Sequence, residues 1–127
     1  MYDETLVLDG LYDIEEALLY IIDRTSCIKI ADDFATTRTG MDVLDVVTIR
    51  LMAIGEEIKK INKRTQEQLL VLYPDIDWKR ITDLRNIIAH EYFRIDAAEI
   101  FDALQNDVQP LLTTIQQMIA DLKKQIQ

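Results

Sequence analysis

The stretch of the chain best equipped for chemistry runs from Arg85 to Tyr92. It contains the only histidine in the sequence, His90, which follows Arg85 by five residues and precedes Tyr92 by two. A guanidinium can hold a phosphate through paired hydrogen bonds, and an imidazole can accept or donate a proton near neutral pH. These two groups are the ones that cleavage of RNA without a metal ion requires.

In such a reaction, one imidazole accepts the proton of a ribose 2′-hydroxyl, and the oxygen attacks the adjacent phosphorus. Arg85 stabilises the charge that develops on the phosphoryl oxygens, and a protonated imidazole gives a proton to the leaving 5′-oxygen. The spacing taken alone also fits a structural role. In that role His90 only makes a hydrogen bond, and Arg85 pairs with a nearby carboxylate.

A helix over residues 78–92 is the expected support for these side chains. At about 100° per residue, its apolar residues share one broad face that meets the core, with Arg85 and Tyr92 along the margin. Asn86 lies four residues before His90, so its side chain could hydrogen-bond the imidazole and fix its tautomer. Arg85 and His90 are about 140° apart and therefore flank a surface instead of pointing at one spot.

Ile87 projects nearly opposite the apolar face of this helix. An apolar residue at that position suggests that the helix is covered on a second side. A two-fold contact through the helix would bring two copies of Arg85 and His90 together in one cleft. Such a symmetric dimer could assemble an acid, a base and a phosphate clamp, which a single helix cannot easily do.

Three other segments repeat apolar residues at three- and four-residue spacing, and they cover residues 11–28, 44–61 and 101–122. This spacing places the apolar side chains on one side of each helix. Alternation at period two is not sustained anywhere, and three Gly and two Pro leave little material for tight turns. The sequence predicts an all-α fold, an up-down bundle of four main helices.

Polar and helix-breaking residues separate these segments. Residues 36–40 are predicted to form a loop between the first two helices, and residues 65–72 to add a brief helix. Pro110 lies inside the last apolar stripe, so a kink there or a fifth helix after it is expected.

Aspartate and glutamate side chains are expected to cap the starts of two helices. Asp75 or Asp77 can cap the third helix, and Asp96 with Glu99 forms a capping pair for the fourth. Such caps satisfy backbone N–H groups that have no partner within the helix. They therefore mark where the helix carrying the motif, and the helix after it, should begin.

The length of 127 residues suits one domain over residues 1–127. Apolar residues make up 49% and charged residues 29%, which is typical of a folded globular protein. The net charge of −9 argues against broad nucleic-acid affinity, because phosphate contacts supply most of that affinity. A nuclease would need a local basic pocket, and a basic protein partner would suit the overall charge better.

We expect a cytoplasmic protein. No run of 18 apolar residues occurs, so no membrane span is expected. The acidic N-terminus lacks the basic start of a secretory signal. Cys27 is the only cysteine and is expected to be a small, partly buried residue of a reduced protein. Asp32, Asp33 and Asp42 have no His or Cys companions, so no metal site is predicted.

The motif formed by Arg85, Asn86 and His90 resembles the HEPN superfamily, which is marked by Arg-x(4–6)-His with a polar residue after the arginine. The match narrows to the HepT-like branch and its Arg-Asn-x-x-x-His-x-Tyr pattern, which Tyr92 completes. The resemblance covers roughly residues 40–120. Other segments similar to that branch are residues 53–57, 73–78 and 92–96.

This resemblance implies a helical bundle that forms a homodimer, with the active cleft at the dimer interface. It also implies metal-independent endoribonuclease activity and a toxin role, and we expect no cofactor. By motif position, Arg85 and His90 are the implied catalytic pair, and Asn86 is a supporting polar residue. The implied partners are an RNA substrate and a minimal nucleotidyltransferase (MNT) antitoxin. The antitoxin would transfer AMP to Tyr92, and the added phosphate would repel RNA from the cleft.

Two other functions fit the same residues. A non-catalytic interaction module would bind a nucleotidyltransferase partner through its helices. A binder of nucleotides or nucleic-acid ends would use Arg85 as a phosphate clamp without turnover. Some charged side chains fit either a site or an ordinary solvated surface, and these are Glu56, Lys79, Arg80 and Arg94.

Overall fold

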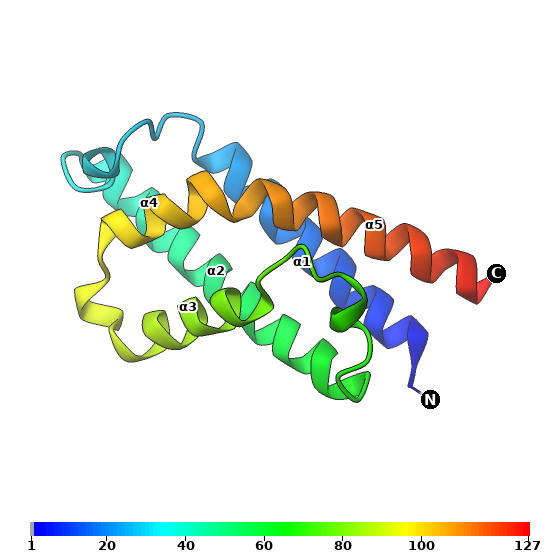
Figure 1. The fold of residues 1–127 in the computed structure, drawn as a ribbon. Coiled ribbons are helices and arrows are strands. Elements are labelled where there is room, and N and C mark those ends of the chain that lie inside the picture. Colours follow the sequence, from blue (N-terminus) through cyan, green and yellow to red (C-terminus); the bar gives the residue numbers. More distant parts are fainter. Residues whose placement is uncertain (1) are drawn as a thin grey trace.

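Five α-helices and three short 3₁₀ segments make up the computed structural model, which describes residues 2–127 except for the side chain of Tyr92 (Figure 1). No strand occurs within these residues, so the predicted all-α class is confirmed. The elements are α1 (Glu4–Arg24), η1 (Ala31–Phe34), α2 (Arg38–Arg64), η2 (Leu70–Leu72), α3 (Trp78–His90), η3 (Tyr92–Arg94), α4 (Ala97–Asn106) and α5 (Val108–Ile126).

The three long helices form the body of the bundle, and α1 contacts both α2 and α5 (Figure 1). Their buried residues are the predicted apolar stripes, such as Leu11, Leu18, Ile58 and Ile115. Each such side chain contributes about 1.5–3 kcal/mol when it leaves water. The shorter α3 packs mainly on α2 and has one fully buried residue, Ile88. Most of α3 is therefore available to form a surface site.

Side-chain caps begin the helices on either side of the motif. Asp77, one of the two predicted caps, accepts a hydrogen bond of 3.0 Å from the backbone N–H of Arg80 at the start of α3. Asp96 accepts one of 2.9 Å from the N–H of Ala98 at the start of α4. The predicted loop at 36–40 is shorter than expected, because Thr37 caps α2 and the helix begins at Arg38.

Two predicted boundaries differ from the structure. The helix over residues 65–72 shrinks to η2, since Gln66 and Glu67 adopt positive φ angles of 53° and 62° and turn the chain away from α2. The break expected at Pro110 falls at Asp107, where α4 gives way to α5. Proline has no N–H to bond the carbonyl four residues earlier, so the discontinuity appears one turn before it.

The link between α1 and η1 differs from expectation at one residue. Cys27 was predicted to be partly buried, but it is exposed and forms no disulfide within the described residues. Cys27 lies beyond the end of α1. It does not belong to the apolar stripe, whose members Ile21 and Ile28 are buried in the core. In the same described part of the chain, no helix combines the length and apolar character needed to cross a bilayer.

Tyr73 fastens the segment before α3 to α5. Its hydroxyl donates a hydrogen bond of 2.7 Å to Asp121, and its carbonyl accepts one of 3.0 Å from the indole of Trp78. Partial burial, reinforced by the hydrogen bond to Asp121, raises the pKa of Tyr73 to about 12 from an ordinary value of 10.0. The contact helps to fix the start of α3.

We predict that Tyr73→Phe lowers the free energy of unfolding by about 1 kcal/mol at neutral pH, because the hydrogen bond to Asp121 is lost. In the wild type, the raised pKa means that this contribution is complete below pH 10 and is lost as the pH rises through about 12. Urea unfolding followed by circular dichroism at several pH values tests this. Tyr12→Phe, at an exposed position, is the matched control. A wild-type advantage that grows between pH 10 and 12 would contradict the assignment.

Candidate functional site

Helix α3 rests directly on α2 at the point where Gly55 faces Arg85. A Cβ atom added to Gly55 would lie 2.5 Å from the Cβ of Arg85 and 3.4 Å from the carbonyl oxygen of Ile81. The first distance is far below a normal contact, so this approach of the two helices needs a residue without a side chain. Gly55 thus sets how closely Arg85 lies against α2.

The guanidinium of Arg85 is held from two sides where α3 contacts α2. One terminal nitrogen forms an ion pair of 2.8 Å with Glu56 of α2, and the other donates a hydrogen bond of 3.1 Å to the side-chain oxygen of Asn86. The side chain of Arg85 is 27% exposed. Its Nε is buried and finds no acceptor among the described residues. The arrangement presents a fixed, partly exposed cation at the α2–α3 contact.

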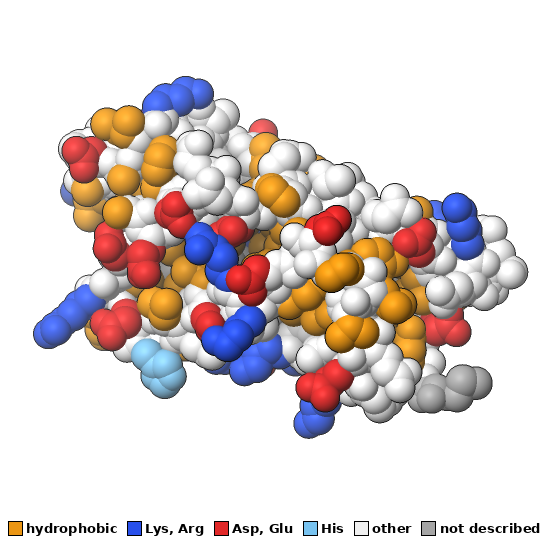
Figure 2. Space-filling model, in the orientation of Figure 1, with side chains coloured by type: hydrophobic (Ala, Val, Ile, Leu, Met, Phe, Trp, Pro, Cys, Tyr) orange, Lys and Arg blue, Asp and Glu red, His pale blue; other side chains and the backbone are white. Residues whose placement is uncertain are grey.

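The structure brings Asn86 to Arg85 instead of to His90. The hydrogen bond expected between Asn86 and the imidazole is not formed among the described side chains, because the Asn86 oxygen accepts from the guanidinium. His90 is the last residue of α3 and is exposed. Figure 2 shows the histidine projecting at the edge of the molecule. Arg85 and Asn86 form one unit, whereas His90 makes no hydrogen bond or ion pair with the described side chains.

Helix α3 ends two residues earlier than predicted. The backbone N–H of Glu91 bonds the carbonyl of Ile87, and the chain then turns into η3 to reach the cap of α4 at Asp96. Tyr92 therefore lies on η3, and its predicted position on the margin of α3 is wrong. The side chain of Tyr92, to which the AMP-acceptor role was assigned, lies outside the described residues.

The opposite side of α3 faces α4. Ile87 is 41% exposed and lines a groove there with Glu99, so within the described chain it is only partly covered. Arg80 is engaged on this side, with ion pairs of 2.5 Å to Asp102 and 3.0 Å to Asp107. These exposed pairs connect α3 to Asp102 of α4 and to Asp107 at the end of α4. Arg80 is thus engaged with carboxylates on the side of α3 that faces α4.

Lys79 and Arg94 differ in how they are held. Lys79 forms an ion pair of 2.7 Å with Asp83 one turn along α3, and the hydrogen bond from that carboxylate raises the pKa of Lys79. Arg94 is exposed on η3 and lines the small cavity between α3 and α4. Neither side chain is tied to Arg85 or His90 by a contact within the described residues.

Comparison of the amino-acid sequence with protein families identifies a known group. A family model described as Ribonuclease HepT-like matches residues 14–118, which include α2, α3 and the whole motif. The chain belongs to this family. The match also takes in most of α1, so the HepT-like region extends further toward the N-terminus than the motifs alone indicated.

Several individual proteins are similar to this HepT-like chain. A Methanocaldococcus jannaschii protein named as a candidate RNase is 29% identical over 113 residues, 89% of this chain and 87% of that protein. A second protein of that organism with the same kind of name is 32% identical over 98 residues, 77% of this chain and 83% of its own length. A Thermococcus cleftensis protein named as a probable ribonuclease HepT is 28% identical over 103 residues, 81% of this chain and 86% of that protein. No solved structure gives a significant match.

Sequence reasoning missed two members of the site. The sequence left open whether Glu56 has a role in the cleft or belongs to a solvated surface, and in the structure Glu56 forms an ion pair with Arg85. Gly55 was noted only as part of a segment similar to the family, and it makes the close contact of α2 with α3. A glycine in the middle of a long apolar stripe is the signal that could have identified this contact, because helix interiors disfavour glycine.

Proposed function

We propose that this HepT-like chain is a metal-independent endoribonuclease in which Arg85 and His90 act on RNA. The observation that carries the proposal is the position of the Arg85 guanidinium, which is held between Glu56 of α2 and Asn86 of α3. Arg85 lies on the same helix as the exposed His90. A cation so placed can bind a phosphate, and an exposed imidazole can reach a ribose hydroxyl. Membership of a ribonuclease family and the RNase names of relatives support RNA as the substrate.

The proposed reaction is an internal transfer at one phosphodiester. His90 accepts the proton of the 2′-hydroxyl, and the oxygen forms a bond to phosphorus while the bond to the 5′-oxygen breaks. Arg85 stabilises the extra charge on the non-bridging oxygens. A protonated imidazole gives its proton to the leaving oxygen. The products are one strand with a 2′,3′-cyclic phosphate and one with a 5′-hydroxyl.

A homodimer would supply the second imidazole. Arg85 and His90 are separated by about 7.5 Å along α3 and by about 140° around it, so one copy does not aim both groups at one atom. A two-fold contact would place two arginines and two histidines around one cleft. Exposed apolar residues beside the motif suit such a contact. Among them Ile49 of α2 is 52% exposed and lies two turns before Glu56 on the same side of the helix.

The proposed biological role is that of a toxin paired with an MNT nucleotidyltransferase antitoxin. Transfer of AMP to the Tyr92 hydroxyl would add a phosphate two residues beyond His90 and hinder the approach of RNA. Expression with and without the neighbouring nucleotidyltransferase gene, followed by intact-mass measurement, tests this step. We expect the mass of one added AMP in the first case, and its absence from Tyr92→Phe. Unmodified wild-type protein after co-expression would refute the modification.

Cleavage of RNA by the purified chain in the presence of a chelator tests the proposed activity itself. Fragments should appear at the same rate with and without the chelator. RNA that is bound but never cut, with binding lost in Arg85→Ala and kept in His90→Ala, would establish a phosphate clamp instead. Toxicity that survives His90→Ala would point to the non-catalytic interaction module.

We predict that Glu56→Gln has opposite effects on the orientation of Arg85 and on the binding of RNA phosphate. The carboxylate holds the Arg85 guanidinium at 2.8 Å, but it also repels phosphate. Its loss should lower kcat about tenfold through poorer orientation, while KM falls about twofold. Steady-state kinetics on a short RNA give both values. Glu57→Gln is the matched control, since Glu57 pairs with Arg64 at 3.7 Å and does not touch Arg85. An unchanged kcat in Glu56→Gln would rule out the positioning role.

A further inference from the structure

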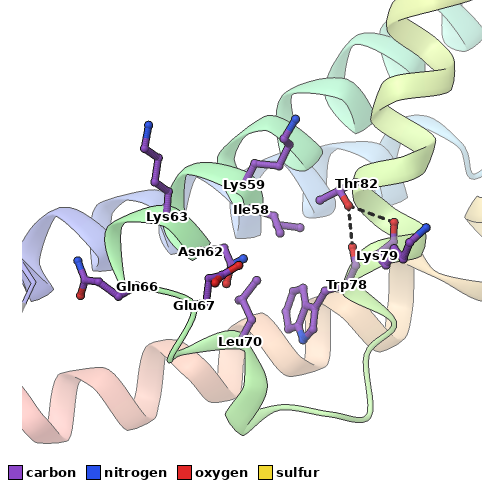
Figure 3. Close-up of a pocket in the computed structure, with 10 residues that line it drawn as sticks. All are labelled: Ile58, Lys59, Asn62, Lys63, Gln66, Glu67, Leu70, Trp78, Lys79 and Thr82. Carbon is purple, nitrogen blue, oxygen red and sulfur yellow. Dashed lines mark hydrogen bonds between the residues drawn. The ribbon is translucent and has the colours of Figure 1, made fainter.

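A cavity of about 680 Å³ lies between the second half of α2 and the start of α3 (Figure 3). Its lining contains the only tryptophan of the chain, Trp78, with Ile58 and Leu70 beside it. Figure 3 shows the indole and these apolar side chains on one side of the cavity, and the carboxylate of Glu67 also belongs to the lining. The walls combine a flat aromatic ring with a charged acceptor.

On both helices the lining of this cavity comes within three residues of the proposed cleavage site. On α3, Thr82 lines the cavity three residues before Arg85. On α2, Lys59 lines it three residues after Glu56. Each step is less than one helical turn, about 5.4 Å. A nucleotide next to a phosphate bound by Arg85 would therefore be close enough along α2 and α3 to reach the cavity.

We propose that this cavity binds one base of the RNA substrate, with guanine as the preferred base. The inference rests on the proposed ribonuclease function and names a subsite for the same substrate. Base stacking on an aromatic side chain is a general means of holding single-stranded RNA. The indole of Trp78 is suited to it because its Nε1 donates a hydrogen bond of 3.0 Å to the Tyr73 carbonyl, which fixes the plane of the ring.

The polar side chains explain the preference for guanine. A carboxylate accepts hydrogen bonds and cannot donate them, and the pairing edge of guanine presents two adjacent N–H donors. Uracil presents one donor between two carbonyl oxygens, which a carboxylate repels. The amide of Asn62, which can both donate and accept hydrogen bonds, also lines the cavity.

Basic side chains stand at the rim of the same cavity. Lys59 and Lys63 lie one turn apart on α2, and Figure 3 shows them extending from the helix toward solvent. In a chain with a net charge of −9, a pair of lysines beside an aromatic cavity is a local exception. They are placed to attract the phosphates on either side of the bound base.

Fluorescence of Trp78 provides a direct test, because no other tryptophan contributes signal. His90→Ala protein, which is expected not to cleave, is titrated with guanosine-only and uridine-only RNA trimers. We expect the guanosine trimer to quench the emission with a Kd about tenfold lower than that of the uridine trimer. In the double variant that combines His90→Ala with Glu67→Gln, the two trimers should bind with equal Kd. Absence of quenching, or a preference that survives Glu67→Gln, would overturn the proposal.

A second pair of variants tests the rim without touching the indole. Lys59→Glu with Lys63→Glu should weaken binding of both trimers about tenfold. Lys123→Glu with Lys124→Glu, at the exposed end of α5, should leave binding unchanged. Equal effects of the two pairs would also overturn the subsite. These experiments distinguish failure of the subsite from failure of the proposed ribonuclease function. Cleavage by the wild type without any change in Trp78 fluorescence would refute only the subsite. Binding of the base without cleavage would refute only the proposed reaction.

Discussion

Replacement of Arg85 or His90 with alanine is expected to lower the rate of RNA cleavage by at least about 100-fold in each case. The two losses have different causes. Without Arg85, the developing phosphoryl charge loses the cation that Glu56 and Asn86 hold in place. Without His90, no group takes the proton of the 2′-hydroxyl. Single-turnover cleavage of a labelled RNA, with a chelator present, measures both effects.

Arg80→Ala is the matched control for the loss of a guanidinium from α3. Arg80 lies on the side that faces α4 and is engaged with Asp102 and Asp107. These pairs are exposed, so their loss should cost little stability, and cleavage should stay within about twofold of the wild type. If Arg85→Ala cleaves as fast as Arg80→Ala while both remain folded by circular dichroism, Arg85 has no part in the reaction.

Gly55→Ala is expected to destabilise the fold and to reduce cleavage together. The new methyl group would lie 2.5 Å from the Cβ of Arg85, an atom fixed by its own backbone, so α3 must move away from α2. Overpacking of this kind costs about 1–3 kcal/mol. The same shift would displace Arg85 from its partners, and small misplacements of reacting groups can cost about 100-fold in rate. Denaturant unfolding and single-turnover cleavage measure the two consequences.

Gly10→Ala supplies the comparison for this substitution. Gly10 is also a buried helical glycine, but an added Cβ would lie 3.3 Å from the ends of the Glu57 and Ile61 side chains. These ends can yield by a few tenths of an ångström, and alanine favours the helix by about 0.8–1.0 kcal/mol. We expect a change in stability of less than about 1 kcal/mol and unaltered cleavage. A Gly55→Ala protein as stable as Gly10→Ala would contradict the packing argument.

The helices themselves could be predicted from the sequence, because each long one buries a regular apolar stripe. Leu11, Ile58 and Ile115 are buried where their spacing placed them. Local hydrogen bonds also allowed the start of α3 to be predicted, through the cap at Asp77. The end of α3 at His90 could not be predicted in this way. The chain turns there to reach α4, and this depends on where α4 packs.

The candidate site also has one part that the sequence predicts and another that depends on tertiary packing. The placement of Arg85, Asn86 and His90 on one helix follows from their spacing, since all lie within two turns. The ion pair with Glu56 joins residues 29 positions apart, and the close contact at Gly55 depends on the packing of two helices. Periodicity assigns each helix a buried face, but it does not determine which residues of two faces meet. Only the assembled fold brings Glu56, Gly55 and the cavity around Trp78 to the motif.

Analysis of the product ends tests the central claim most directly. The wild-type protein is incubated with a defined RNA in the presence of a chelator, and the fragments are identified by mass spectrometry. Attack by the 2′-hydroxyl, assisted by His90 and Arg85, predicts 2′,3′-cyclic phosphate on one fragment and a 5′-hydroxyl on the other. Fragments that carry a 5′-phosphate, or an RNA that stays intact, would contradict the account.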